Sequence, residues 1–355
     1  MRTAAIAFGL LFAFFAGWLV ATGSQRVDDL GTAVEVALRE GDRLERTARL
    51  VPLLEQLDAD NLSGVLSVYR RELSGLGECE IRLFVGAWTR FDGRAAFEET
   101  LGWMPSKLRV GVQAAAQGWA LHDVAQARPI IEATAESRPR LAELLLQALV
   151  IGWVHSGESG LDAYLRTVAP SNDDLLTVAI GATRRAQGNA SLLAWSERFG
   201  ANLDPLLRAK VFRKAVRVVG RRDPQHAARF ALSRWGQEYA SEGPRVLVEA
   251  WIETDPQEAF EWLRTTAPLA SREEAVGLAF GRWLYRDRRA ALAWLEGAER
   301  TTFHDPAIRT LARQLAGSSP EDAHAWCHRT QSEAMRKQCA ETVVRSAARG
   351  RARTP

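Results

Sequence analysis

The chain repeats itself with a period of about 32 residues, and this constrains its fold more than any other feature. Four segments show the repeat when they are aligned: AWTRFDGRAAFEET (87–100), AWIETDPQEAFEWL (250–263), RWLYRDRRAALAWL (282–295) and QLAGSSPEDAHAWC (314–327). Each has a large apolar residue, then a turn, then an Ala-rich segment. Units of this length cannot bury a core alone, so they stack into arrays.

Three slots mark each unit when the first large residue is counted as slot zero. Slot zero holds Trp88, Trp119, Trp153, Arg184, Val219, Trp251, Trp283 and Leu315, at steps of 31 to 35 residues. Slot eight is Ala in six of the eight units, and slot eleven is aromatic or apolar in seven. Nine of the 12 Trp residues fall in slots zero and eleven. We therefore expect the Trp rings to pack between units rather than to stack on sugars.

Each unit is interpreted as a pair of helices. Asp223-Pro224, Asp255-Pro256 and Ser319-Pro320 place a capping side chain before Pro at the first helical position, where the missing N–H has no cost. The apolar residues within 259–263 follow the i, i+3, i+4 spacing of one buried helical face. Two helices of about a dozen residues and two short loops account for one period. The sequence predicts an all-α chain, with a right-handed α-solenoid of about eight to nine hairpins over residues 44–346.

These residues resemble the TPR-like class of α-solenoids, and more closely the W-x3-DP-x2-A-x2-WL type of bacterial helical repeats. The resemblance covers residues 44–346. It departs from a true tetratricopeptide, because the period is near 32 rather than about 34 and the W-x2-L-G-x2-Y signature is absent. It implies an extended concave surface that grips proteins or peptides. It does not imply an activity, since solenoids serve many functions.

The N-terminus predicts a membrane address. There is no charged residue between Arg2 and Arg26, and the apolar run from Ala4 to Ala21 reaches the length that spans a bilayer. Small residues at 21–23 leave a cleaved signal peptide as the alternative. We expect residues 1–25 to be an anchor or signal peptide and residues 26–43 to be a juxtamembrane helical linker. The body would be periplasmic and held by the inner membrane, or periplasmic or secreted after cleavage.

A basic stripe is the densest charge feature. It consists of Lys210, Arg213, Lys214, Arg217 and Arg221, which share one face of a helix. Such a stripe is either the solvated face of an amphipathic helix or a site for an anionic partner. The candidate partners are an acidic peptide, a phosphate-bearing envelope polymer and lipid headgroups. If the first helix of each hairpin lines the concave side, the stripe would lie in the groove.

The overall charge is nearly balanced. A net charge of +3 over 355 residues argues against a nucleic-acid-binding protein, which carries a stronger basic excess. Arg outnumbers Lys by 42 to 4, which we interpret as the mark of a GC-rich bacterial genome. The last residues, 347–355, form a basic tail that we expect to be disordered and available to a membrane or an acidic partner.

Three cysteines are too few for a disulfide scaffold. Cys327 and Cys339 lie on helices joined by a turn near residues 330–332, so in an oxidising compartment they are candidates for a bridge across the terminal hairpin. The sequence leaves the bridged and reduced states open, and Cys79 is expected to be unpaired and buried. His324, Cys327 and His328 have helical metal-ligand spacing, but packing slots explain His324 and Cys327, and no metal site is predicted.

No catalytic constellation is present in the sequence. Gly157-Glu158-Ser159-Gly160 resembles the Glu-Ser pair of lytic transglycosylases, but the segment that follows in those enzymes is absent. We expect a membrane-tethered, extracytoplasmic helical-repeat scaffold or adaptor that binds a protein or peptide of the cell envelope, with no enzymatic activity and no cofactor. The alternative is a peptidoglycan or polysaccharide hydrolase, or an accessory subunit of one.

Overall fold

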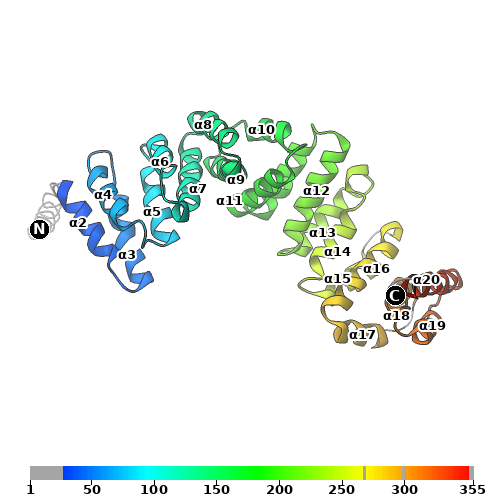
Figure 1. Cartoon of the computed structure of the whole chain (residues 1–355). Helices are drawn as coiled ribbons and strands as arrows, with labels where there is room; N and C mark the ends of the chain where they lie inside the picture. The colour runs from blue at the N-terminus through cyan, green and yellow to red at the C-terminus, as the bar shows by residue number, and fades with distance from the viewer. Residues whose placement is uncertain (1–26, 267–268, 298, 300, 352–355) are drawn as a thin grey trace, which may run out of the picture. The chain divides into compact units, whose positions relative to one another are not determined.

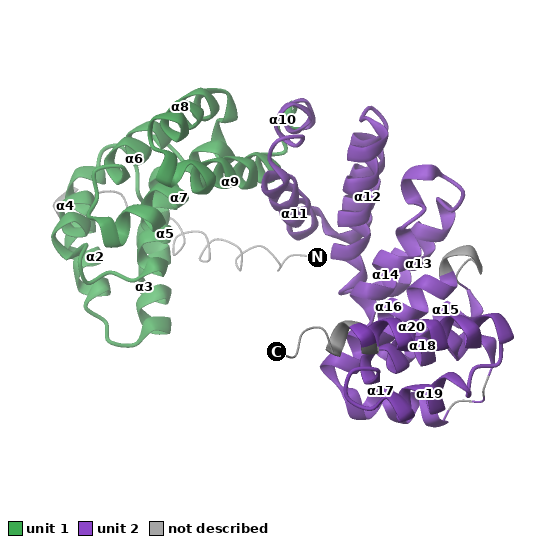
Figure 2. Cartoon of the chain, turned by 45° about the vertical axis from the view of Figure 1, so that its right-hand side comes forward, with its two compact units in different colours: residues 1–161 green, residues 162–355 purple. Residues whose placement is uncertain are grey.

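The computed structural model describes residues 27–266, 269–297, 299 and 301–351. Within these residues the chain forms α-helices, two short 3-10 turns and no β-strand, which confirms the all-α class (Figure 1). None of the helices in this part is both long and apolar enough to cross a bilayer. The predicted anchor or signal segment, 1–25, lies outside the described residues. The chain divides into two compact units, residues 1–161 and 162–355 (Figure 2).

Unit 1 contains eight described helices, and each packs against a helix one or two places along the chain. They are α2 (Val27–Leu38), α3 (Arg43–Glu55), α4 (Leu62–Glu72), α5 (Glu78–Trp88), α6 (Gly93–Thr100), α7 (Pro105–His122), α8 (Val124–Ser137) and α9 (Pro139–Ser156). The helix α3 packs against α5, α5 against α7, and α7 against α9. The alternate helices α6 and α8 each pack on the helix that follows them.

The helix α2 belongs to this packed array. It contacts α3 and α4, and a Cβ atom on Gly31 would lie only 3.1 Å from the backbone carbonyl of Gly64 on α4. The sequence predicts a juxtamembrane helical linker at residues 26–43. The contacts of α2 show that helical packing already begins before residue 44. Glycines on both helices allow this approach because neither carries a side chain at the contact.

Unit 2 continues the alternation. Its helices are α10 (Leu161–Val168, beginning at the last residue of unit 1), α11 (Asp173–Gly200), α12 (Pro205–Gly220), α13 (Pro224–Ser233), α14 (Gly243–Trp251), α15 (Pro256–Thr265), α16 (Leu269–Arg286), α17 (Arg288–Gly297), α18 (Asp305–Leu315), α19 (Pro320–Cys327) and α20 (Glu333–Arg351), with 3-10 turns η1 (Glu238–Ala240) and η2 (Thr302–His304). The helices α12, α14, α16, α18 and α20 pack side by side in that order. Inside α11, Gly188 has a φ of 85° and divides two helical segments.

The C-terminal helix is longer than the sequence suggested. It extends to Arg351, so the first part of the basic tail predicted to be disordered, 347–355, is helical. Residues 352–355 lie outside the described residues. Between residue 333 and Gly350 the sequence has neither Gly nor Pro to end the helix, and the arginines of this segment are good helix formers.

The repeat slots are packing positions. The slot-zero Trp residues all lie at or near the C-terminal ends of their helices and are buried: Trp88, Trp119, Trp153, Trp251 and Trp283. All six slot-eight alanines are 0% exposed, as expected where helices approach closely. Where α15, α16 and α17 meet, the Trp283 and Trp294 ring centroids are 5.9 Å apart, and Phe260 contacts both rings. This distribution supports packing as the reason for the high Trp content.

The turn between the two helices of a unit carries a further repeated feature, at slot four. Asp223 and Asp255 accept hydrogen bonds from the third N–H of the following helix, as predicted, whereas Ser319 makes no such bond. Asp residues at slot four of three other units cap their helices in the same way: Asp92, Asp123 and Asp287. In the remaining two units slot four is Gly157 or Gly188, each with positive φ. Slot four therefore sets the turn in seven of the eight units.

Candidate functional site

The basic stripe is ion-paired along its whole length. Lys210 and Lys214 lie 3.1 and 2.8 Å from Asp173 of α11, and Arg213 lies 3.8 Å from Glu242 beside α14. Farther along the helix, Arg217 lies 3.8 Å from Glu249 and Arg221 lies 3.2 Å from Glu253. Hydrogen bonding to Lys214 lowers the pKa of Asp173 below its ordinary value. An anionic partner would compete with these carboxylates for the same cations, so the stripe is a contact between helices as well as a solvated face.

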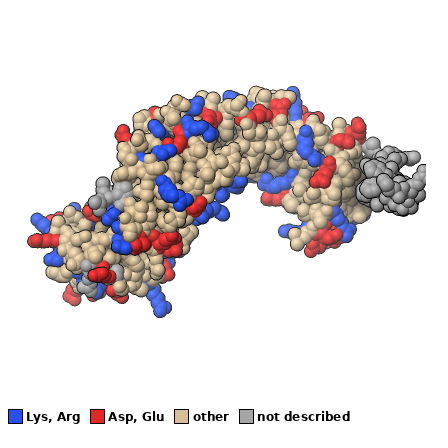
Figure 3. All heavy atoms as spheres, turned by 180° about the vertical axis from the view of Figure 1, so that it is seen from behind, with Lys and Arg blue, Asp and Glu red and all other residues tan. Residues whose placement is uncertain are grey.

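Mixed charge extends beyond this helix. Figure 3 shows Lys and Arg side chains interspersed with Asp and Glu side chains over the visible face, with no large area of a single sign. The intermingling agrees with the small net charge of +3. Long-range electrostatic attraction of a polyanion therefore has little support from the surface as a whole.

Glu249 is the centre of an arginine cluster. It is only 5% exposed and contacts Arg245 at 2.6 Å on its own helix, Arg282 at 3.2 Å on α16, and Arg217 at 3.8 Å on α12. A buried carboxylate requires compensation of this kind, because its desolvation is otherwise costly. One side chain thus joins three helices that lie side by side.

Unit 2 has a groove of about 930 Å³ on the face formed by α14, α16, α18 and α20. Its floor and walls include Leu278, Gly281, Arg282, Tyr285, Arg309 and Arg313. None of the five stripe residues lines it. The groove nevertheless adjoins the stripe, because its lining includes Glu249 and Glu253, the ion-pair partners of Arg217 and Arg221.

Aromatic and apolar groups in the groove are unusually open to solvent. Tyr285 is 93% exposed and Leu278 is 40% exposed, although both lie on α16, whose opposite face is buried. Arg286, one residue after Tyr285, donates to the backbone carbonyl of Glu253 at 2.5 Å. That hydrogen bond satisfies a backbone carbonyl just after the end of α14 and fixes the Arg286 side chain in the groove wall.

A smaller cavity of about 410 Å³ lies between α15 and the segment that precedes α18. It is lined by aromatic residues, among them Phe260 and Trp294, and by His304. Burial lowers the pKa of His304, and its Nδ1 atom lies 3.2 Å from Thr301 Oγ1. These contacts account for His304 as a structural residue of η2, where it closes a capping box with Thr301.

The terminal hairpin contains the disulfide for which the sequence offered candidates. Cys327 and Cys339 are bonded, with Sγ atoms 2.02 Å apart, and both residues belong to a buried cluster. His324 was assigned to an apolar packing slot but is exposed, as is His328. Among the described residues no three metal-ligating side chains converge, here or elsewhere.

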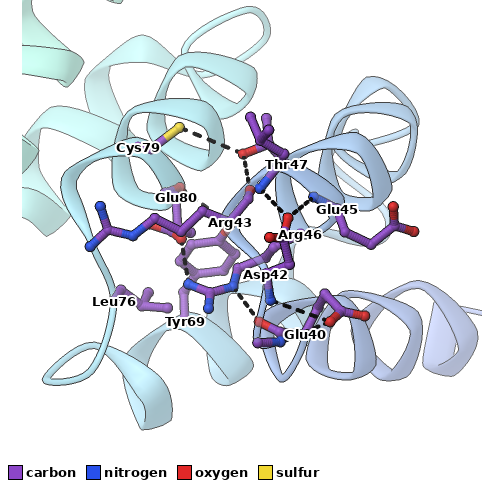
Figure 4. A network of polar contacts seen from close by, with 12 residues as sticks. Glu40, Asp42, Arg43, Glu45, Arg46, Thr47, Tyr69, Leu76, Cys79 and Glu80 are labelled. Carbon is purple, nitrogen blue, oxygen red and sulfur yellow. Dashed lines mark hydrogen bonds and ion pairs between the residues drawn. The ribbon is translucent and has the colours of Figure 1, made fainter.

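Cys79 is exposed, not buried as the sequence suggested. It lies beside a polar network that joins α3 to α5 (Figure 4). In that network Arg46 donates to the Glu80 carboxylate at 2.7 Å, and the buried hydroxyl of Tyr69 donates to the Glu80 carbonyl at 3.3 Å. Burial tends to raise the pKa of Glu80, but hydrogen bonds from backbone N–H groups and Arg46 lower it overall. The Cys79 Sγ atom is 4.0 Å from Thr47 Oγ1, at the rim of this network.

Comparison with known proteins adds no relative. No protein-family model, curated protein or solved structure matches the chain.

The groove residues were missed at the sequence level, although a signal for them exists. Counting back from slot zero, positions six and two residues earlier are Arg245 and Glu249 in one unit, and Arg309 and Arg313 two units later. In the unit between them both positions are glycine. Comparing these two positions across three adjacent units shows glycines between two pairs of long charged side chains. That comparison would have predicted a groove at the middle unit.

Proposed function

We propose that this chain is a membrane-tethered, extracytoplasmic helical-repeat scaffold or adaptor that binds a protein or peptide of the cell envelope. In this proposal the helical pairs stack as a TPR-like, right-handed α-solenoid, and the apolar segment at residues 1–25 holds the body at the inner membrane. No residue has a catalytic role. The body binds its partner through the groove of unit 2.

The observation that carries the proposal is the groove itself. It is open to solvent, and it presents Tyr285, Arg282 and Arg313, residue types that are enriched at protein interfaces. Because Tyr285 is 93% exposed, most of its apolar area is available to be buried by a partner.

Site-specific photocrosslinking in cells tests the proposal. A photoreactive amino acid at position 285 should give discrete adducts with one or a few envelope proteins. The control places the same amino acid at position 206, since Leu206 is 84% exposed at the start of α12 and does not line the groove. The same adducts from both positions, or no adduct from position 285, would count against a role for the groove.

The membrane tether needs a separate measurement. The mass of the mature protein distinguishes an uncleaved anchor from a signal peptide, because cleavage after Gly23 would leave a chain that begins at Ser24. Retention in the membrane fraction after alkaline carbonate washing is expected for the anchored form. A mature chain beginning near Ser24 would replace the anchor with a soluble periplasmic body.

A further inference from the structure

The groove is hollow because α16 lacks two side chains that its neighbours possess. Gly277 and Gly281 occupy the positions that carry Arg245 and Glu249 on α14, and Arg309 and Arg313 on α18. A Cβ atom on Gly281 would already lie 3.3 Å from a methyl group of Thr310, so α16 and α18 approach closely at this point. The result is a trough with long side chains on both sides.

The walls of the trough carry more arginines than carboxylates, four against three. Four arginines line it: Arg282, Arg286, Arg309 and Arg313. Of the carboxylates that also line it, Glu249 pairs with Arg282 of the groove at 3.2 Å and with Arg217 and Arg245 from outside it, and Glu253 pairs with Arg221 from outside it. Glu274, on α16, is the remaining carboxylate of the lining. The groove is therefore more basic than its composition indicates.

The arginine N–H groups that can still bind a ligand lie mainly on α18. Arg313 is exposed and makes no hydrogen bond or ion pair with any residue that the structure describes. One turn away, Arg309 holds Gln338 at 2.9 Å and Glu273 at a longer 3.5 Å. A guanidinium has five N–H donors, so both side chains retain the capacity to bind a carboxylate in a two-pronged manner.

The α16 side supplies an apolar surface opposite these donors. Leu278 and Tyr285 are two helical turns apart on α16, and Arg282 lies between them. An apolar side chain seated between Leu278 and Tyr285 would bury surface that now faces water, and such burial stabilises a complex. Arg282 would stand at the boundary between the apolar and basic sides.

From this arrangement we infer that the groove binds an acidic peptide segment that carries a large apolar or aromatic residue. The carboxylates of the segment contact Arg309 and Arg313, and its apolar residue lies against Leu278 and Tyr285. The inference rests on the proposed function and adds the chemical class of the partner. A basic or uncharged segment does not satisfy the free donors of α18.

Panning a display library of random peptides against the purified full chain tests this assignment. We expect enrichment of peptides with several Asp or Glu residues and at least one aromatic or large aliphatic residue. Replacing Asp and Glu by Asn and Gln in a selected peptide should weaken binding at least about tenfold, as measured by fluorescence anisotropy, the effect of losing one charge-assisted hydrogen bond.

Point variants locate the binding. Arg313→Ala and Tyr285→Ala should each weaken binding of a selected peptide at least about tenfold, whereas Arg229→Ala should not, because Arg229 is an exposed arginine on α13 outside the groove. Circular dichroism shows whether each variant keeps its helix content. Enrichment of basic or neutral peptides, no enrichment, or equal losses in the Arg229 and Arg313 variants would overturn the inference. If one of these negative results were found but position 285 still gave adducts in cells, the proposed function would stand. Only the inference that the partner segment is acidic would then be removed.

Discussion

A close contact between two helices in unit 1 predicts a large effect of a single methyl group. A Cβ atom on Gly152 of α9 would lie 2.3 Å from the backbone oxygen of Gln117 and 2.7 Å from the Cβ of Ala120, both on α7. These helices form the most extensive packed pair of the structure. Because a backbone oxygen cannot rotate away, Gly152→Ala forces α7 and α9 apart.

The magnitude follows from two opposing effects. Overpacking of this kind costs about 1–3 kcal/mol, and the rigid backbone contact places it at the upper end. Alanine restores about 0.5–1 kcal/mol of helix propensity. The net loss is about 2 kcal/mol, which lowers the melting temperature by roughly 4–8 °C for a folding unit of this size.

A matched variant isolates the contact. Gly86 lies within α5, and a Cβ atom added there meets nothing within 4 Å, so Gly86→Ala should raise stability by about 0.5–1 kcal/mol. Both variants are compared with wild type by thermal unfolding, followed by circular dichroism at the helical minimum. A Gly152→Ala chain that melts at or above wild type, or a Gly86→Ala chain that loses as much, would refute the close approach of α7 and α9.

Three further predictions concern caps, thiols and pH. Asp255→Ala should lower stability by about 1 kcal/mol through loss of a helix cap, whereas Ser319→Ala, which removes no cap bond, should be neutral in urea unfolding. Alkylation under denaturing conditions without reductant should label Cys79 alone and after reduction all three cysteines, and reduction should destabilise the terminal hairpin by about 3 kcal/mol; three labelled thiols before reduction would exclude the bridge. Because burial lowers the pKa of His304 from its ordinary 6.5, the unfolded chain binds a proton that the folded chain excludes, so stability falls as the pH drops through 6.5. The urea midpoint should show this slope, and His304→Asn, which keeps an acceptor near Thr301, should reduce it.

The sequence was sufficient to predict the packing elements. Slots zero and eight are buried in most units: the five slot-zero Trp residues and the six slot-eight Ala residues are buried, whereas Arg184, Leu315 and Leu161 in these slots are only partly buried. For that reason the positions of Trp251 and Ala259 could be interpreted without knowledge of the rest of the chain. The capping role of Asp255 was equally local, since Asp255 accepts its hydrogen bond from the N–H of Glu258, three residues later.

The stripe and the groove could not be predicted in this local way. The partner of Arg217 is Glu249, and that of Arg221 is Glu253, each one period of 32 residues farther along. A window that covers one helix shows only cations. Comparing the same slot in successive units would have paired them, and the same comparison would have shown glycine at 277 and 281 between two charged neighbours. The exposure of Cys79 had no such signal, because Cys79 lies outside the repeated slots.

The arginine cluster around Glu249 restricts how this chain could have grown by duplication. Arrays of similar units lengthen when a unit is copied in place, and most contacts tolerate the copy because each unit meets an equivalent neighbour. The contact between Glu249 and Arg282 does not, since a unit inserted between α14 and α16 would carry that arginine away and leave the carboxylate with one fewer partner. Copies inserted at this junction would therefore be selected against unless they brought an arginine of their own. The cluster therefore makes the packing of α16 on α14 depend on the identity of one residue, the arginine at position 282.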